Sequence, residues 1–501
     1  MDAYISGVGM TKFGRLKDSL EKLMSQAASL ALKDAQLERV DAIYIGVMNV
    51  EEFVGDSNFA AILADTLGLT GIPSTRVETA SSTGAGAFET AFYPVASGHM
   101  KNVLVLAGEK MTHLPTAKTT RILSEVIDRS ERRYGATMPA LAAMIAQKYA
   151  QEYNLSITRL GDILAQVAIK NHSNGSLNPY AQFRKTITKE DYLKSQMVSY
   201  PLRLYDCAPI TDGASAIVLT SKPTPVKVSG IGHATDTSAV SHRASLTSFN
   251  STKEAALKAY SMAQVNPSDI QFAEVHDAFT LFEIIGTEDL GLFPPGQGWK
   301  ALEEGKTQLR GRLPINPSGG LKSRGHPVGA SGLAQLVEIV YQLRGDAGGG
   351  RQLGRAEIGL AQSIGGLGNN NLVTILERSD RKRVVKEVWS LDYHPEINVS
   401  KKVITPPLTG GVGVLETFTT LYAPPEGFRS PLTLGFVKTK SGETVMACNP
   451  DYRSPKKLKI GKKVLLKTRE GLYVFEKFTL WNRLKHRIKG PPRAEVPGLE
   501  R

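Results

Sequence analysis

Residues 4–9, Tyr-Ile-Ser-Gly-Val-Gly, return in the second half of the chain as residues 227–232, Lys-Val-Ser-Gly-Ile-Gly. Each copy is followed by an alanine-rich stretch of helical character and then by an apolar strand: residues 27–37 and 42–46 after the first copy, residues 255–265 and 270–275 after the second. Because strand, helix and strand follow in the same order twice, the pattern indicates a duplicated unit.

Short apolar strands alternate with longer helical patterns through both halves. Residues 103–108 and 214–220 are continuous apolar runs, which are typical of strands in a sheet that helices cover on both faces. An insertion of helical and loop character lies between them. These patterns predict an α/β fold with an N-terminal half over residues 1–222, including the insertion, and a C-terminal half over residues 223–380.

The composition changes near residue 381. Five short segments rich in Val, Thr and Lys follow, separated by turns, and they predict a small all-β barrel of the OB type within residues 381–501: 412–421, 432–438, 444–447, 463–467 and 472–477. Residues 380–501 hold 24 Lys and Arg against 12 Asp and Glu, whereas the rest of the chain is almost neutral. A basic segment predicts an anionic partner, such as coenzyme A, nucleic acid or an acidic protein; a merely solvated basic surface is the alternative.

The overall composition excludes several classes of protein. With 41% hydrophobic and 22% charged residues among 501, the chain has the composition of a soluble globular enzyme. No apolar run approaches the roughly 18 residues that span a membrane, and no secretory signal is visible at the N-terminus. Cys207 and Cys448 are the only cysteines, too few for a disulfide framework or a Cys-rich zinc site. A cytoplasmic protein without a metal site or membrane partner is expected.

Residues 77–88, Val-Glu-Thr-Ala-Ser-Ser-Thr-Gly-Ala-Gly-Ala-Phe, indicate the end of a buried segment, a sharp turn of small residues and the start of a helix. Ser81 is therefore predicted at a helix N-terminus, where backbone N–H groups and the helix dipole favour developing negative charge. This is a suitable position for a nucleophile or an oxyanion site. The structural alternatives are that the serine caps the helix or forms part of a neutral pocket wall.

Three later segments complete a pattern: residues 275–280 (Val-His-Asp-Ala-Phe-Thr), 316–320 with 325–332 (Asn-Pro-Ser-Gly-Gly and Gly-His-Pro-Val-Gly-Ala-Ser-Gly), and 363–368 (Ser-Ile-Gly-Gly-Leu-Gly). With the Ser81 turn they resemble the motifs of thiolases, most closely the sterol-carrier-type and archaeal groups. The resemblance implies a duplicated five-layer fold, α-β-α-β-α, over residues 1–380. Residues 381–501 resemble the OB-fold partner domain of acyl-CoA thiolases and related carbon–carbon bond enzymes, without the usual zinc-binding cysteines in residues 384–402.

The resemblance also implies roles for individual residues. His326 would orient or deprotonate the nucleophile and donate to one thioester oxyanion, and His276 would complete that site. The backbone N–H groups of Ser81 and Gly365 would form a second oxyanion site. The substrate would be a coenzyme A thioester, with no bound cofactor, and the protein would be a homodimer or part of a larger complex of acyl-CoA enzymes. Three residues are predicted to contact coenzyme A, with a solvated basic loop as the alternative for the last two: Ser318, Lys118 and Arg121.

The chain departs from the family at its thiols. Thiolases carry cysteine where this chain has Ser81, and many carry further cysteines where it has Ala278 or Ser363. A serine hydroxyl has no accessible anion and must lose its proton to a base during attack. The leading hypothesis is carbon–carbon bond chemistry on a 3-oxoacyl- or 3-hydroxyacyl-CoA, with His276 and His326 central. Its first form is acetyl-CoA acetyltransferase-like acyl transfer on a 3-oxoacyl-CoA, with Ser81 in place of the usual cysteine.

Two alternatives remain open at this point. Retro-aldol cleavage of a 3-hydroxyacyl-CoA needs enolate stabilisation and proton transfer but no acyl-enzyme, and a non-catalytic scaffold would only bind coenzyme A. Binding of single-stranded nucleic acid by the lysines of residues 456–463 and the aromatic residues Phe475, Phe478 and Trp481 is a less favoured interpretation.

Overall fold

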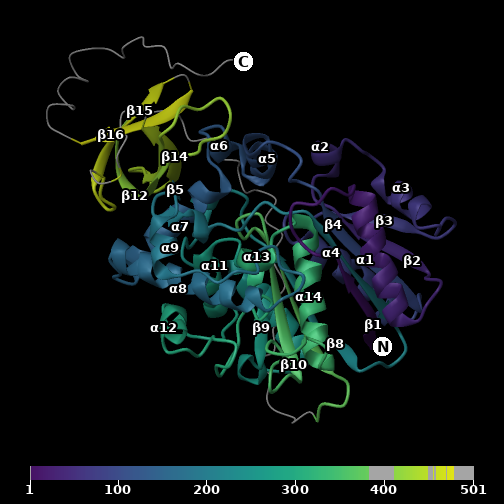
Figure 1. Cartoon of the computed structure of the whole chain (residues 1–501). Coiled ribbons are helices and arrows are strands. Elements are labelled where there is room, and N and C mark those ends of the chain that lie inside the picture. The colour runs from purple at the N-terminus through teal and green to yellow at the C-terminus, as the bar shows by residue number, and fades with distance from the viewer. Residues whose placement is uncertain (1, 383–410, 450–454, 456–457, 470, 479–501) are drawn as a thin grey trace.

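The computed structural model describes residues 2–382, 411–449, 455, 458–469 and 471–478. A nine-stranded sheet runs through the body of the molecule, and its two halves meet where β1 and β8 pair antiparallel (Figure 1). In spatial order the strands are β3 (Ser74–Val77), β2 (Ala42–Gly46), β4 (Asn102–Glu109), β7 (Gly213–Thr220), β1 (Ala3–Met10), β8 (Val226–Thr235), β11 (Asn370–Arg378), β10 (Ile358–Gly365) and β9 (Phe272–Glu274). The repeated strand found in the sequence therefore forms the centre of the sheet.

Helices cover both halves of the sheet and also fill the space between them. The central pair is α4 (Thr83–Ala96) and α14 (Val328–Arg344), which contact each other; α4 packs on β2 and β4, and α14 contacts β4, β7 and β10. The outer helices are α1 (Leu20–Ala35), on β1 and β7, and α10 (Asn250–Ala263), on β8 and β11. These contacts give the layer order α-β-α-β-α and confirm the predicted five-layer fold.

Glycines in the repeated strands explain why both copies pack in the same way. A Cβ atom on Gly9 would overlap the Ala27 carbonyl of α1, and one on Gly232 would overlap the Ala255 carbonyl of α10. Only glycine in the strand and a small residue in the helix let these backbones approach so closely. The Gly-x-Gly and alanine patterns are therefore two sides of one contact, made once in each half.

The remaining helices lie mainly in connections. Two short helices follow β2: α2 (Val50–Val54) and α3 (Phe59–Thr66). The predicted insertion between β4 and β7 contains α5 (Thr116–Leu123), η1 (Ser124–Val126), α6 (Arg129–Arg132), α7 (Met138–Glu152), α8 (Ile157–Ser176), α9 (Lys189–Lys194), β5 (Met197–Ser199), β6 (Leu202–Arg203) and η2 (Leu204–Asp206). The second half adds η3 (Val240–His242), η4 (Pro267–Asp269), α11 (Thr280–Asp289), α12 (Gly298–Glu303) and α13 (Gly320–Arg324).

A small all-β barrel follows the five-layer body, as predicted. Its strands are β12 (Gly411–Leu421), β13 (Leu432–Lys438), β14 (Thr444–Asn449), β15 (Lys463–Arg469) and β16 (Leu472–Lys477). They close in the order β12-β13-β14-β16-β15, with β15 returning to β12 and only β14 and β16 parallel among these pairs. Residues 384–402, where no zinc-binding cysteine was found, lie outside the described residues.

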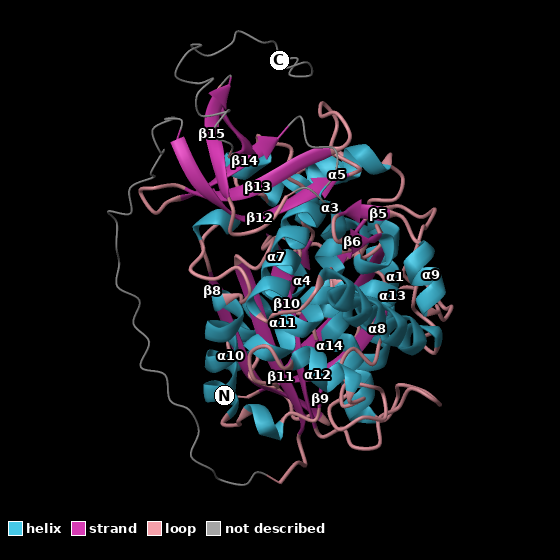
Figure 2. Ribbon diagram, turned by 90° about the vertical axis from the view of Figure 1, so that its left-hand side faces the viewer, coloured by secondary structure: helices cyan, strands magenta, loops and turns pink. Residues whose placement is uncertain are grey.

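The barrel is joined to the body by a shared core, which the sequence did not indicate. Figure 2 shows it above α7, and β12 also pairs with β5 through Leu421 and Ser199. The Thr417 hydroxyl donates to the Met144 carbonyl of α7 at 2.7 Å. Barrel side chains such as Phe418 belong to the same apolar cluster as those of α7. The insertion and the barrel therefore form one packed unit.

The core of the barrel also bears on the nucleic-acid interpretation. Phe475 is fully buried inside the barrel, so its ring is not available to stack on a base. Trp481 and two of the lysines, Lys456 and Lys457, lie outside the described residues. Of the three aromatic residues considered for nucleic-acid binding, Phe475 is therefore not available.

Candidate active site

The first turns of α4 and α14 meet beside the end of β10. A Cβ atom on Gly84 would lie 2.6 Å from the Gly329 carbonyl oxygen. A Cβ atom on Gly332 would lie 2.8 Å from the Ala85 nitrogen and 2.7 Å from the Ser363 hydroxyl. Three of the predicted motifs, which are far apart in the sequence, therefore come together at this point.

Ser81 lies on a tight turn just before α4. The preceding residue, Ala80, has a φ of +55°, a conformation that alanine rarely adopts and that indicates a backbone under strain. The N-cap of α4 is Ser82, so the alternative that Ser81 caps the helix is wrong. Ser81 itself is 6% exposed, so its side chain lies almost entirely inside the protein.

Gly365, at the end of β10, lies directly against this turn. A Cβ atom at residue 365 would lie 2.7 Å from the Ser82 hydroxyl and would overlap the Thr79 carbonyl. Glycine is therefore required for the two backbones to approach each other. This contact brings the predicted oxyanion residues, Ser81 and Gly365, into one neighbourhood; the convergence of their N–H groups on one oxygen stays a prediction.

His276 and His326 face each other. Their ring centroids are 5.2 Å apart and the rings are nearly perpendicular, at 88°. His276 follows β9, and His326 lies between α13 and α14. The second motif therefore joins the other three through this pair of rings.

Ser331 holds one ring nitrogen of His326. Nδ1 lies 2.7 Å from the Ser331 hydroxyl oxygen, and the same hydroxyl lies 2.9 Å from the Pro327 carbonyl oxygen. The single hydroxyl proton goes either to Pro327, with Nδ1–H donating to Ser331, or to Nδ1 itself. In the first arrangement Nε2 of the neutral ring keeps its lone pair and can accept a proton.

Both histidines are neutral. Burial, with the nearby Arg324 guanidinium, lowers the pKa of His326 to about 3. Burial also holds the pKa of His276 well below its usual range, and the neighbouring His326 and Arg324 lower it further. Neutral imidazoles can accept protons and donate hydrogen bonds without placing a fixed charge in the site.

Glu274 and Arg324, each two residues before one of the two histidines in the chain, form a buried ion pair next to the site. Arg324 is fully buried, and its guanidinium lies 3.4 Å from the Glu274 carboxylate. Ser318 is also buried, and its hydroxyl donates to Glu274 at 2.6 Å. Burial raises the pKa of Glu274 to about 7 despite the Arg324 charge. Ser318 therefore has an internal structural partner, while its predicted contact with coenzyme A stays a prediction.

Asp277 anchors the loop between the two histidines. Its carboxylate accepts from the Leu321 backbone at 2.6 Å and from the Asn171 amide of α8 at 2.7 Å. The insertion, the second motif and α13 are therefore linked by one buried carboxylate. Neither Asn171 nor the Glu274–Arg324 pair was singled out from the sequence, although Asp277 directly follows a residue that was.

The other predicted contacts lie farther out or lack a reactive thiol. Lys118 and Arg121 are exposed on α5. Cys207 lies beside the second motif, since the neighbouring Ala208 N–H donates to the Ala278 carbonyl at 2.8 Å. Burial raises the pKa of the Cys207 thiol to about 12, so it is not a thiolate at neutral pH.

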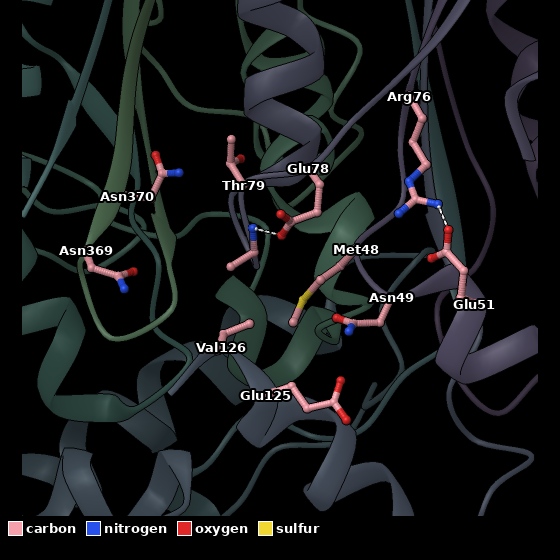
Figure 3. A pocket seen from close by; sticks show the side chains of 11 residues that line it. Met48, Asn49, Glu51, Arg76, Glu78, Thr79, Glu125, Val126, Asn369 and Asn370 are labelled. Atoms are coloured by element: carbon pink, nitrogen blue, oxygen red, sulfur yellow. Dashed lines mark hydrogen bonds and ion pairs between the residues drawn. The ribbon is translucent and has the colours of Figure 1, made fainter. Parts of the chain in front are cut away.

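A polar cavity of about 510 Å³ adjoins the Ser81 turn. Thr79 and Ala80 lie on one wall, and Asn370 from β11 lies across from them (Figure 3). On the far side, Arg76 and Glu51 form an ion pair of 2.5 Å. The turn that carries Ser81 therefore borders a cavity lined by polar side chains from neighbouring elements.

No group of three or more His, Cys, Asp or Glu side chains among the described residues could hold a metal ion. None of the helices in this part of the chain is both long enough and apolar enough to cross a membrane.

Comparisons with known proteins agree with this architecture. Residues 3–223 match the family model described as thiolase, N-terminal domain, and residues 232–378 match thiolase C-terminal domain-like. An acetyl-CoA acetyltransferase of Methanothermobacter thermautotrophicus is 41% identical over 387 residues, covering 75% of this chain and all of the relative. Sterol carrier protein 2 of Bos taurus is 34% identical and covers 74% of this chain and 71% of its own length.

A solved structure has the same fold at lower sequence identity. It is described as an Ltp2-ChsH2(DUF35) aldolase, is 24% identical and has a TM-score of 0.65. The match covers 76% of this chain and 99% of that chain.

Proposed function

Because this chain belongs to the thiolase family, we propose that it makes or breaks a carbon–carbon bond in a 3-oxoacyl-CoA, with Ser81 as the acyl acceptor. The observation that carries the proposal is the buried pair of His276 and His326, with Nδ1 of His326 held by Ser331 where the four motifs meet. With Nδ1–H donating to Ser331, Nε2 has the lone pair that the reaction needs. Its acetyl-CoA acetyltransferase relatives support acyl transfer as the reaction type.

In the cleavage direction each residue has a defined task. His326 Nε2 would take the proton of Ser81 while the serine oxygen bonds to C3 of the substrate. The C2–C3 bond would then break, and the acetyl-CoA enolate would take up a proton at C2. Coenzyme A thiol would finally receive the acyl group from Ser81, restoring the serine hydroxyl. Oxyanions would be stabilised by His276 on one side and by the Ser81 and Gly365 N–H groups on the other.

Retro-aldol cleavage of a 3-hydroxyacyl-CoA is the second candidate. The specific observation in its favour is the lack of a thiol at Ser81, Ala278 and Ser363, combined with a barrel packed on the insertion. Here a histidine would take the proton of the 3-hydroxyl group, the C2–C3 bond would break to give a carbonyl compound, and the acetyl-CoA enolate would be protonated at C2. The DUF35 aldolase neighbour supports this candidate at the level of fold only.

The surroundings of the site complete the proposal. Lys118 and Arg121 on α5 would contact the phosphates of coenzyme A, and the basic barrel would lie near the same anion. A homodimer in the cytoplasm, alone or with other acyl-CoA enzymes, is the proposed state of the protein.

Intact-protein mass spectrometry after brief incubation with acetoacetyl-CoA tests the role of Ser81. We expect an acetyl adduct on the wild-type protein and none on Ser81→Ala, because only the hydroxyl can hold the acyl group. Ser81→Cys is expected to raise thiolysis, since a thiol ionises more readily than a hydroxyl.

The remaining outcomes separate the other functions. Cleavage of a 3-hydroxyacyl-CoA by both the wild-type protein and Ser81→Ala, with no adduct, would assign the retro-aldol reaction. If the protein binds coenzyme A but neither the wild type nor Ser81→Cys turns over either substrate, the function is that of a non-catalytic coenzyme A-binding scaffold. Ser97→Ala, which changes an exposed serine at the other end of α4, is the matched control.

A further inference from the structure

His233 of β8 lies between two oxygen-bearing side chains from different layers. Its Nδ1 is 2.7 Å from the Glu89 carboxylate of α4, and its Nε2 is 2.5 Å from the side-chain oxygen of Asn370 on β11. The His233 and Glu89 side chains are 29% and 13% exposed, so the contact is partly shielded from water. No step of the proposed reaction uses these three residues.

The two oxygens favour a doubly protonated ring. With the amide oxygen of Asn370 toward Nε2, both ring nitrogens of His233 donate, because a carboxylate and an amide oxygen only accept hydrogen bonds. The imidazolium and the Glu89 carboxylate then form an ion pair. Two other ionisable groups approach this contact: the Tyr93 hydroxyl donates to Glu89 at 3.1 Å, and the Lys258 ammonium of α10 donates to the His233 backbone carbonyl at 2.9 Å.

Asn370 connects this ion pair to the active site. Its backbone carbonyl oxygen lies 3.0 Å from the hydroxyl of Ser82, next to Ser81, and shares that hydroxyl with the nearer Thr79 carbonyl at 2.6 Å. It also pairs with Gly365 at the closed end of the β10–β11 hairpin. In Figure 3 Asn370 lies on the wall of the cavity opposite Thr79. One residue therefore holds the Ser81 turn through its backbone and His233 through its side chain.

We propose that protonated His233, paired with Glu89, is a positioning residue that fixes Asn370 and thereby the distance between the Gly365 backbone and the Ser81 turn. Loss of the His233 proton removes the donor to Asn370 and loosens the hairpin. The consequence for catalysis rests on the proposed carbon–carbon bond chemistry, because the oxyanion site would lose its spacing.

The direction of the pH effect follows from the ion pair. The hydrogen bond to Glu89 raises the pKa of His233 above its ordinary value of 6.5, although burial and the Lys258 charge oppose the shift. A raised folded-state pKa means that the stabilisation is complete below the unfolded value and is lost as the pH rises through the folded value. The hairpin should therefore be tight in mildly acidic solution and loosen on the alkaline side.

A first experiment compares the pH dependence of kcat for the wild-type protein, Glu89→Gln and His233→Gln, with the exposed His99→Gln as control. We expect an alkaline decrease in the wild type that moves to lower pH by about one unit or more in Glu89→Gln, because the neutral amide no longer stabilises the imidazolium. His233→Gln should lack this decrease and show a kcat lowered by about 10- to 100-fold at pH 6. His99→Gln should match the wild type.

A second readout does not depend on turnover. Hydrogen exchange of residues 362–372, corrected for the intrinsic pH dependence of exchange, should accelerate above the same pH in the wild type and at every pH in His233→Gln. If wild type and Glu89→Gln show identical exchange and identical pH profiles, the positioning role is refuted. If exchange follows the pattern but no acyl-CoA is turned over, the proposed function fails while the positioning of the hairpin stands.

Discussion

Replacement of His326 by alanine is expected to lower kcat by about 10²- to 10⁴-fold, the range found for loss of a general base or acid. The reason is the position of the ring: Ser331 holds Nδ1, so proton transfer in the proposed reaction falls to Nε2. Steady-state kinetics on acetoacetyl-CoA and on a 3-hydroxyacyl-CoA measure the loss. The KM should change little, because the ring acts on the reacting atoms and not on the rest of coenzyme A.

Two comparisons make this prediction sharper. His242→Ala alters an exposed histidine of η3 and should leave kcat unchanged. Ser331→Ala removes the group that orders the two tautomers and should cause an intermediate loss. Since burial lowers the pKa of His326 to about 3, its protonation should not reduce kcat above pH 5. Wild-type activity in His326→Ala would remove this histidine from the mechanism.

Replacement of Arg324 by methionine is expected to reduce the free energy of unfolding by about 3–5 kcal/mol, the cost of leaving a buried charge without its partner. Arg324 and Glu274 are both fully inaccessible to solvent, so water cannot replace the lost contact. Urea unfolding followed by circular dichroism measures the change. The double variant Arg324→Met/Glu274→Gln should recover part of the loss, because the stranded charge is then gone.

The pH dependence of this destabilisation carries a definite sign. Arg324 lowers the pKa of Glu274, while burial raises it to about 7 overall. Without Arg324 the pKa of Glu274 rises further. The carboxyl group is then protonated at pH 5 and carries no unpaired buried charge. The destabilisation should therefore be smaller at pH 5 than at pH 8. Equal values at both pH values would contradict the role given to the Glu274 charge.

The fold was predictable from the sequence because its signals are local. The Gly-x-Gly strands and the alanine-rich helices appear twice, and packing of one on the other needs these residue types at these positions. The barrel strands were found to within about two residues because each is a short segment rich in β-forming residues and bounded by turns. The docking of the barrel on α7 was not predictable, since Thr417 and Met144 carry no mark of the contact between them.

The active site was predictable where a motif is short and continuous. The His276 and His326 segments and the Ser81 turn were identified in this way, and the structure brings them together. Sequence reasoning did not find the residues that act through long-range contacts. His233 and Glu89 lie 144 residues apart, and each resembles an ordinary surface residue in its own segment.

The shared core of α7 and the barrel also sets an order of events while the chain is being made. Met144 and its partner Thr417 are 273 residues apart, and a ribosome adds roughly 5–20 residues per second. Roughly 15 to 55 seconds therefore pass between the synthesis of α7 and the synthesis of β12, the strand that covers its apolar face. During that interval the apolar face of α7 is exposed to solvent, the condition under which growing chains are most prone to aggregate.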